Sequence, residues 1–302
     1  MAAFFIWSYS LDIRSAFMGV IFVLMWSSAF SSAKIIVQSA PPLSSLSLRF
    51  LISGLIAISI AYALGQRIRL NRSQWTSTTI FGVCQNGLYL GLFFVAMQWI
   101  EAGLAAIIAS SMPLIVAFLS WAFLKEKVGL VGVIGLLAGF IGVTLIMSGR
   151  LEGGSDPFGL ILCMIGVTAL AFATLAVRGA SSGGNVLMIV GVQMLIGAAA
   201  LFFPAILLET FHVEWSLKLV AAFSYTIFIP GLAATWIWFQ LVGRIGTTRA
   251  ATYHFLNPFF GVAIAAVLLG EEFGMRDIVG VAIITGGILA VQLSKQKPKT
   301  VA

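Results

Sequence analysis

The sequence predicts an all-α polytopic membrane protein whose ten transmembrane helices form two five-helix repeats of inverted topology. Three observations favour this fold class. The chain is very apolar and divides into ten uncharged stretches, its basic residues gather in alternate loops, and one motif occurs twice, 145 residues apart. Ten spans take up nearly all of the 302 residues, which leaves no room for a soluble domain.

The apolar composition is the first of these observations. Hydrophobic residues make up 60% of the chain and charged residues 9%, with a mean hydropathy of +1.08, whereas about a quarter of the residues in soluble proteins are charged. A transmembrane helix needs about 20 mostly apolar residues, and ten stretches of 17 or more residues lack Asp, Glu, Lys and Arg. These predicted spans, 1 to 10 in chain order, are 15–33, 50–66, 73–100, 102–124, 128–149, 157–177, 179–208, 219–243, 250–270 and 278–294.

The basic residues between the spans predict the orientation. With a cytoplasmic amino terminus, twelve Lys and Arg residues lie on the cytoplasmic side and four on the opposite side, which is a strong positive-inside signal. We therefore expect a multi-pass protein of the bacterial inner membrane with both termini in the cytoplasm. The net charge of +7 then reflects topology and attraction to anionic lipid, so the lipid bilayer is a predicted partner and nucleic acid is not.

A repeated motif predicts the internal duplication. Pro113 and Glu126 recur at the same spacing as Pro258 and Glu271. Only eight of 45 aligned positions are identical, but the prolines and glutamates are informative because the chain holds only eight prolines and ten acidic residues. A period of about half the chain indicates a duplicated unit. The glycines that align in the same register are Gly129, Gly135 and Gly142 with Gly274, Gly280 and Gly287.

Each half contains five predicted spans, so the second copy begins on the opposite side of the membrane from the first. This is an inverted-topology repeat, an arrangement found in many secondary transporters. The predicted repeats are residues 1–149 and 150–302, integrated in one membrane domain. In their amino-terminal parts the offset is 144 residues, which aligns Arg49 with Gln193.

Three segments carry a family resemblance: WSSAF at 26–30, AGLAAIIASSMPLIVAFLSWAFLKE at 102–126 and TTRAATYHFLNPFFGVAIAAVLLGEE at 247–272. Over nearly its whole length the chain resembles the drug/metabolite transporter superfamily, EamA type, and most resembles the bacterial aromatic amino-acid exporter group. The resemblance implies ten helices around a central cavity, a small-molecule substrate and alternating access between the halves. No cofactor or metal is expected, since the chain carries no metal or redox signature.

The two repeated prolines, Pro113 and Pro258, fall near the middle of spans 4 and 9. A proline inside a helix removes one backbone hydrogen bond, and exposed backbone at membrane depth is tolerated where protein buries it or water reaches it. We expect both kinks to lie beside a central cavity and to act as flex points in gating. The alternative is a kink that only improves packing.

Small residues on spans 5 and 10 predict close helix packing, between the halves or between protomers, and the oligomeric state stays open. They are Gly132, Gly135, Gly139, Gly142, Gly280, Gly286 and Gly287.

Polar and aromatic residues in the middle of spans predict the substrate site. Polar side chains in lipid are costly, so they are expected to face the bundle interior or a wet cavity. Aromatic walls with a few amide and hydroxyl groups suit a small amphipathic molecule. Interhelical hydrogen bonding without a ligand is the alternative. The predicted substrate-binding residues, on spans 3, 4, 8 and 9, are Gln85, Tyr89, Ser110, Trp238, Tyr253, His254 and Asn257.

Charges inside the spans are scarce. Arg49 is the one basic residue considered as a partner for a substrate carboxylate, with snorkelling to the outer interface as the favoured alternative. No Asp or Glu lies at mid-span, so proton antiport of organic cations lacks its usual carrier. His254 could titrate near neutral pH, and proton coupling stays open.

We therefore predict an exporter of aromatic or otherwise neutral amino acids or similar small metabolites. A carrier for another metabolite or drug class is the main alternative. The chain is not predicted to be an enzyme, because it has no HExxH, no GxGD and no paired mid-membrane carboxylates. The remaining alternatives are an intramembrane enzyme, a channel or a sensor, and saturable counterflow would distinguish a carrier from a channel.

Overall fold

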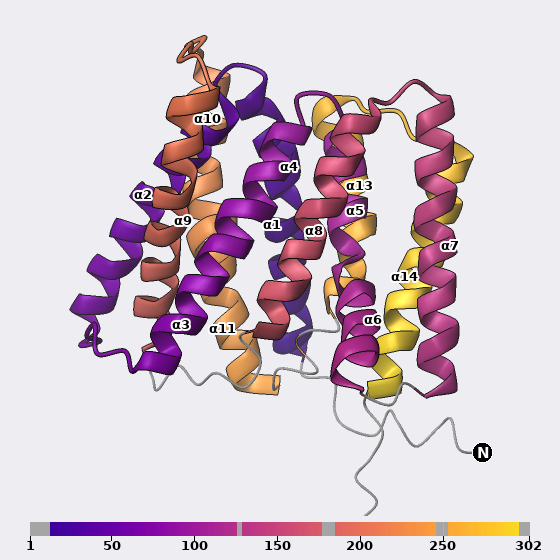
Figure 1. Ribbon diagram of the computed structural model, residues 1–302, viewed down its shortest axis with the longest axis horizontal. Helices are drawn as coiled ribbons and strands as arrows, with labels where there is room; N and C mark the ends of the chain where they lie inside the picture. Colours follow the sequence, from indigo (N-terminus) through magenta and orange to yellow (C-terminus); the bar gives the residue numbers. More distant parts are fainter. Residues whose placement is uncertain (1–12, 126–128, 177–184, 246–249, 251–252, 296–302) are drawn as a thin grey trace, which may run out of the picture.

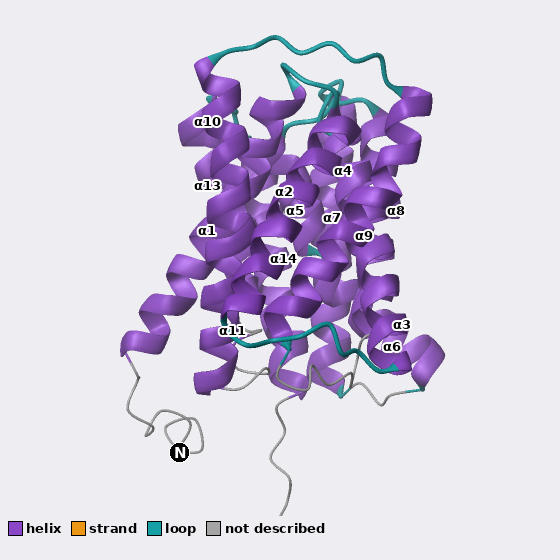
Figure 2. Ribbon diagram, turned by 90° about the vertical axis from the view of Figure 1, so that its left-hand side faces the viewer, coloured by secondary structure: helices purple, strands orange, loops and turns teal. Residues whose placement is uncertain are grey.

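The computed structural model describes residues 13–125, 129–176, 185–245, 250 and 253–295. Within these ranges all regular secondary structure is helical, and the helices run alongside one another in one bundle (Figure 1, Figure 2). The first half contains α1 (Ile13–Val37), α2 (Pro42–Ala63), α3 (Arg72–Phe81), η1 (Gly82–Tyr89), α4 (Leu90–Ala96), α5 (Ala102–Ser110), α6 (Met112–Leu124) and α7 (Leu130–Glu152). The second half contains α8 (Pro157–Ala176), α9 (Val186–Leu208), α10 (Leu217–Thr226), η2 (Ile227–Ala233), α11 (Ala234–Ile245), η3 (Tyr253–Leu256), α13 (Asn257–Leu269) and α14 (Met275–Lys295).

The predicted spans are present as apolar helices. Nine helical segments of the described residues are long and apolar enough to cross a membrane. Segment Tyr253–Leu269 is shorter, and the span predicted there, 250–270, includes residues 251–252 outside the described ranges. The prediction of an all-helical polytopic membrane protein is confirmed. Span 3 consists of α3, η1 and α4, span 4 of α5 and α6, span 8 of α10, η2 and α11, and span 9 of η3 and α13.

We name the two ends of the bundle after the ends of α1: the Ile13 face and the Val37 face, the latter at the top of Figure 1. The loops that follow α1, α4, α7, α9 and α13 all lie at the Val37 face (Figure 1). These loops and the adjoining helix ends hold the acidic residues Glu101, Glu152, Asp156, Glu209, Glu214, Glu271, Glu272 and Asp277. The cytoplasmic location of the Ile13 face stays a prediction.

Helix contacts between the halves follow an approximate two-fold relation. Span 2 packs on span 7 (α2 on α9), span 5 on span 10 (α7 on α14) and span 4 on span 9 (α5 on α13), so each joins its counterpart in the other repeat. The first two pairs lie at opposite sides of the bundle in Figure 1. Span 1 packs on spans 8 and 9, and span 6 packs on their counterparts, spans 3 and 4. The two halves therefore interlock instead of standing apart.

Glycines make the closest of these contacts. A β-carbon on Gly135 would lie 2.7 Å from the carbonyl oxygen of Gly287, and one on Gly287 would lie 2.6 Å from that of Gly135. The same relation recurs between Gly142 and Gly280, where the corresponding distances are 3.0 and 3.1 Å. The predicted glycine packing face is confirmed, and it joins the two halves. Gly286 is the exception, because a β-carbon there would meet no described atom within 4 Å.

Polar capping holds α2 and α9 to each other at both ends. The Glu209 carboxylate accepts hydrogen bonds from the backbone N–H groups of Leu43 (2.6 Å) and Ser44 (2.8 Å), at the start of α2. At the opposite face, Gln66 Oε1 accepts one from the backbone N–H of Met188 (3.0 Å), at the start of α9. Helix starts leave unpaired N–H groups, so each helix is capped by a residue that follows its partner.

The repeated glutamate also acts as a cap. Glu271 accepts hydrogen bonds from the backbone N–H groups of Ala102 (2.7 Å) and Gly103 (2.8 Å), at the start of α5. A carboxylate is favourable at this position because the amino-terminal end of a helix carries partial positive charge. The counterpart residue, Glu126, lies outside the described residues.

An ion-pair group links three further segments at the Val37 face. Arg150, in the last turn of α7, pairs with Glu101 at 2.6 Å and with Asp277 at 3.0 Å. Burial raises the pKa of Glu101, and the positive charge of Arg150 opposes this shift. These contacts hold the ends of spans from both halves together.

Replacing Glu271 by alanine is expected to lower the free energy of unfolding by about 1–2 kcal/mol, because two N–H groups at the start of α5 lose their acceptor. Thermal denaturation in detergent measures the effect. Glu272→Ala is the matched control, since the neighbouring side chain is exposed. Equal stability of the two variants would contradict the capping role.

Candidate functional site

Spans 4 and 9 are both interrupted at the repeated proline. Helix α5 ends at Ser110 and α6 begins at Met112, with Pro113 in its first turn. Span 9 begins as the 3₁₀ segment η3 and continues as α13, which starts at Asn257 with Pro258 in its first turn. Proline is tolerated there because the first N–H groups of a helix need no intrahelical partner. The role of these breaks in gating stays a prediction.

Spans 3 and 8 contain a second kind of irregularity. In each, a segment of π-helix interrupts the α-helix, Gly82–Tyr89 in span 3 and Ile227–Ala233 in span 8. The two segments occupy equivalent positions, since they start 145 residues apart. The π-helical turns are rare and frequently lie at functional sites. Here both contribute to the same cavity.

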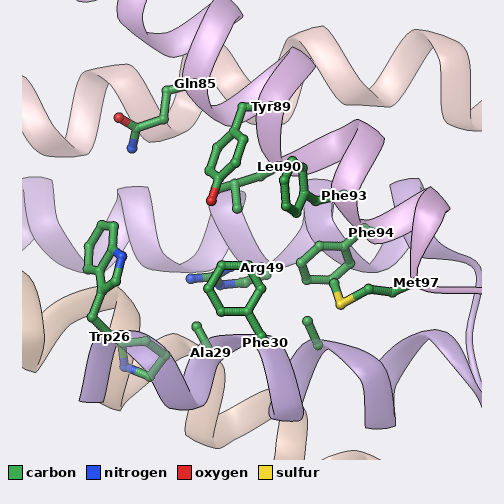
Figure 3. Close-up of a pocket in the computed structure, with 12 residues that line it drawn as sticks. Trp26, Ala29, Phe30, Arg49, Gln85, Tyr89, Leu90, Phe93, Phe94 and Met97 are labelled. Atoms are coloured by element: carbon green, nitrogen blue, oxygen red, sulfur yellow. The ribbon is translucent and has the colours of Figure 1, made fainter. Parts of the chain in front are cut away.

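This cavity lies between α1, α2, η1, α4 and η2, so both halves contribute to its wall. Its lining is mainly apolar and includes several aromatic residues, among them Trp26 and Phe30 from α1, Tyr89 from η1 and Phe93 from α4 (Figure 3). Pro230 of η2 is the contribution of the second half. Flat apolar surfaces of this kind suit an apolar or aromatic molecule.

The cavity is contracted in this structure. Its volume is about 60 Å³, whereas pockets that hold small organic ligands typically have roughly 300 Å³ or more. The buried side chains of Ala33, Phe94 and Met97 line its end nearer the Val37 face. One helical turn beyond Ala33, at Val37, begins an open vestibule of about 470 Å³. An organic substrate can therefore occupy the cavity only after these side chains or helices move.

Arg49 contributes the positive charge of the cavity. Its residue is 7% exposed, and it lies about 10 Å along α2 from the Val37 face. Figure 3 shows the guanidinium among the labelled side chains Trp26, Phe30 and Tyr89. The expectation that Arg49 snorkels to the interface is wrong, because α2 directs this side chain into the bundle.

The Arg49 guanidinium has no protein counter-ion in the described part of the chain. Its Nε is buried without a hydrogen-bond partner there. The guanidinium carbon lies 5.2 Å from the centre of the Phe50 ring, a cation–π distance. A buried charge is costly without a partner, so the position of Arg49 is favourable for an anionic group.

Two of the predicted substrate residues, Gln85 and Tyr89, line this cavity (Figure 3). Their side chains project from consecutive turns of the π-helical segment. The phenol and the amide add hydrogen-bonding groups to the aromatic wall.

Four other predicted residues gather in an adjacent aromatic cluster nearer the Ile13 face. The rings of Trp238 and His254 lie 5.1 Å apart, and each contacts Phe22, at 4.9 and 5.3 Å. Asn257 Nδ2 lies 2.9 Å from His254 Nδ1. Tyr253 packs on the same cluster. Asn257 Oδ1 is buried without a hydrogen-bond partner among the described residues. The cluster lies on the Ile13 side of the cavity, next to Trp26.

Trp26 belongs to both groups, because it lines the cavity and its ring lies 6.2 Å from that of His254. Ser110 belongs to neither. Its Oγ donates to the carbonyl oxygen of Ala106 at 2.7 Å, and the neighbouring Ser111 Oγ donates to that of Ile108 at 2.6 Å. Both hydroxyls are therefore satisfied by their own helix. The structure brings spans 1 and 2 to this cavity where spans 4 and 9 were expected.

Comparison with known proteins decides the family. The model of the EamA-like transporter family matches the chain twice, over residues 13–148 and 157–293. The chain belongs to the EamA-like transporter family. The two matches each cover five of the spans described above, and this EamA-like transporter is accordingly built from two copies of the family unit.

Several relatives are named as transporters. The EamA-like chain is 25% identical to the uncharacterized transporter YvbV of Bacillus subtilis (strain 168), covering 96% of this chain and 95% of YvbV. It is 25% identical to the uncharacterized inner membrane transporter YedA of Escherichia coli (strain K12), covering 92% and 90%. One solved crystal structure shares the fold with a TM-score of 0.65 at 21% identity, covering 93% of this chain and 96% of the other.

Several lining residues of this EamA-like transporter escaped the sequence-based prediction of the site. Trp26 and Phe30 are the ends of the WSSAF segment, whose aromatic residues four apart lie on one helix face. Arg49 was attributed to the interface because it directly precedes predicted span 2 (50–66), although no other charged residue lies between Lys34 and Arg67. These two signals, a shared helix face and an isolated charge, could have indicated the cavity.

Proposed function

We propose that this EamA-like transporter exports neutral or aromatic amino acids, or similar small metabolites, across a bacterial inner membrane. The observation that carries the proposal is the aromatic cavity to which both repeats contribute. Its phenol, amide and guanidinium groups suit an amphipathic molecule with a polar head and an apolar body.

Alternating access between the repeats is the mechanism we propose. In this mechanism the aromatic cluster of Phe22, Trp238 and His254 is the barrier on the Ile13 side, and Phe94 and Met97 are the barrier on the Val37 side. If only one of these two barriers opens at a time, the cavity is exposed to one compartment and closed to the other. With the Ile13 face cytoplasmic, movement of the aromatic cluster admits substrate and movement of Phe94 and Met97 releases it. In this scheme Trp238, Tyr253, His254 and Asn257 contact substrate during entry.

Counterflow in proteoliposomes tests the function. Vesicles loaded with unlabelled Phe, Thr or Met are diluted into the radiolabelled amino acid, and saturable accumulation is expected for at least the aromatic substrate. Flux that does not saturate would indicate a channel. Absence of flux for every amino acid, with flux of a sugar or an organic cation in the same vesicles, would replace the proposed substrate class.

Tyr89→Ala is expected to reduce counterflow by about tenfold or more, because the ring packs on the substrate and its hydroxyl hydrogen-bonds to it. Leu88→Ala is the matched control, since the adjacent side chain is 47% exposed on the outside of the bundle. The stability of both variants is compared by thermal denaturation. Equal transport by the two variants would remove Tyr89 from the site.

A further inference from the structure

The two-fold relation between the halves breaks down at Arg49. In one half, Asn86 of η1 packs on α9, and its Nδ2 donates to the carbonyl oxygen of Gln193 at 3.0 Å. The repeat offsets pair Asn86 with Gly231 and Gln193 with Arg49. The symmetry-related contact therefore joins Gly231, which has no side chain, to Arg49.

The Arg49 guanidinium lies next to Gly231. A β-carbon on Gly231 would lie 3.7 Å from Arg49 Nη2 and 3.7 Å from Ser53 Oγ. Neither Arg49 Nε nor Ser53 Oγ has a hydrogen-bond partner among the described residues, although both are buried. Two buried side chains that each have an unpartnered polar atom thus lie next to Gly231, which belongs to the same π-helical segment as the cavity-lining Pro230.

Protein carboxylates cannot complete this arrangement. The acidic residues of the described chain lie at the Val37 face, and the cavity lining contains none. A guanidinium binds a carboxylate through two parallel N–H···O bonds, which would satisfy the exposed edge of Arg49. The aromatic residues Trp26, Phe30 and Tyr89 line the same cavity, where they can contact the apolar body attached to that carboxylate.

We propose that Arg49 binds the carboxylate of the transported molecule, and that the substrates are carboxylates with an apolar, preferably aromatic, body. This inference rests on the proposed function and narrows it, because it makes the carboxylate essential and the amino group dispensable. Gly231 borders the guanidinium, and Ser53 lies one helical turn from Arg49 on α2.

Ligand-induced stabilisation of the purified full-length protein tests the inference without transport. 3-Phenylpropanoate carries the carboxylate without the amino group, whereas phenethylamine and phenylalaninamide lack a carboxylate. We expect 3-phenylpropanoate to raise the midpoint of thermal denaturation and to compete with Phe, and the other two compounds to have no effect. An equal shift with phenethylamine, or no shift with the carboxylate, would overturn the proposal.

Variants locate the carboxylate at Arg49. Arg49→Gln installs the residue found at the symmetry-related position, and it is expected to weaken 3-phenylpropanoate binding by about tenfold or more. Arg49→Lys, which keeps the charge and loses the planar fork, is expected to retain part of the affinity. Gln193→Ala is the matched control with unchanged affinity. Wild-type affinity in Arg49→Gln would contradict the role of Arg49. If that variant does not fold, wild-type affinity in Arg49→Lys would contradict the role instead. The series of analogues tested on the wild-type protein needs no variant and tests the requirement for a carboxylate.

The two proposals fail in different ways. Carboxylate-specific stabilisation without amino-acid counterflow would reject amino-acid export and retain the Arg49 site. Amino-acid counterflow that phenethylamine inhibits as strongly as 3-phenylpropanoate does would retain amino-acid export and reject the carboxylate site at Arg49.

Discussion

Gly287→Ala is expected to lower the free energy of unfolding by about 1–3 kcal/mol. The added methyl group would lie 2.6 Å from the carbonyl oxygen of Gly135 and 2.8 Å from the backbone nitrogen of Gly139. Backbone atoms of a neighbouring helix cannot move aside as a side chain can, so α7 and α14 must separate. Lost packing between two spans is not offset by hydrophobic burial in lipid.

Gly286→Ala provides the control for this prediction. A β-carbon there meets no described atom within 4 Å, and alanine is the better helix former by roughly 0.5–1 kcal/mol. Denaturation in mixed detergent micelles compares the two variants. The prediction is that adjacent glycines respond in opposite directions. Destabilisation by both substitutions to the same extent would show that the α7–α14 contact does not determine the result.

Replacing the repeated prolines is expected to slow transport by about tenfold to a hundredfold. Alanine restores the missing N–H and stabilises a continuous helix by up to about 3 kcal/mol, and each 1.4 kcal/mol added to a barrier is about tenfold in rate. If the helices must bend at Pro113 and Pro258 when access to the cavity changes from one face to the other, continuous helices will resist this bending. The double variant Pro113→Ala/Pro258→Ala is expected to be the slowest.

Counterflow and thermal denaturation together separate gating from packing. Pro204→Ala is the matched control, because Pro204 lies inside the uninterrupted helix α9. We expect the Pro113 and Pro258 variants to keep their stability and lose rate, and the control to transport normally. Normal rates in the double variant would indicate that the breaks only improve packing.

The fold could be predicted from local features of the sequence. Each uncharged stretch predicts a helix wherever it occurs, since backbone polar groups in lipid must be satisfied within the segment. The π-helical segment of span 3 could not be predicted in this way. Its residues Gly82–Tyr89 contain no proline. The segment packs closely on α9, where a β-carbon on Gly82 would lie 2.8 Å from the carbonyl oxygen of Gln193.

The lining of the cavity was predicted in part, for a related reason. Gln85 and Tyr89 share a helix face, so the sequence indicated them directly. Ser110 has a similar polarity and depth, but its hydroxyl is satisfied within α5. Which polar side chain turns to its own helix and which to the cavity depends on neighbours that sequence spacing does not reveal.

By itself, the sequence determined that this protein has two homologous sets of membrane-spanning helices, because the thickness of the bilayer imposes a length and a polarity on every span. The meeting of α1, α2, η1, α4 and η2 around one cavity, with Arg49 in its wall, depends on how the helices pack together. Packing between helices distant in the chain selects which face of each helix is buried, and in lipid hydrophobicity alone cannot select it.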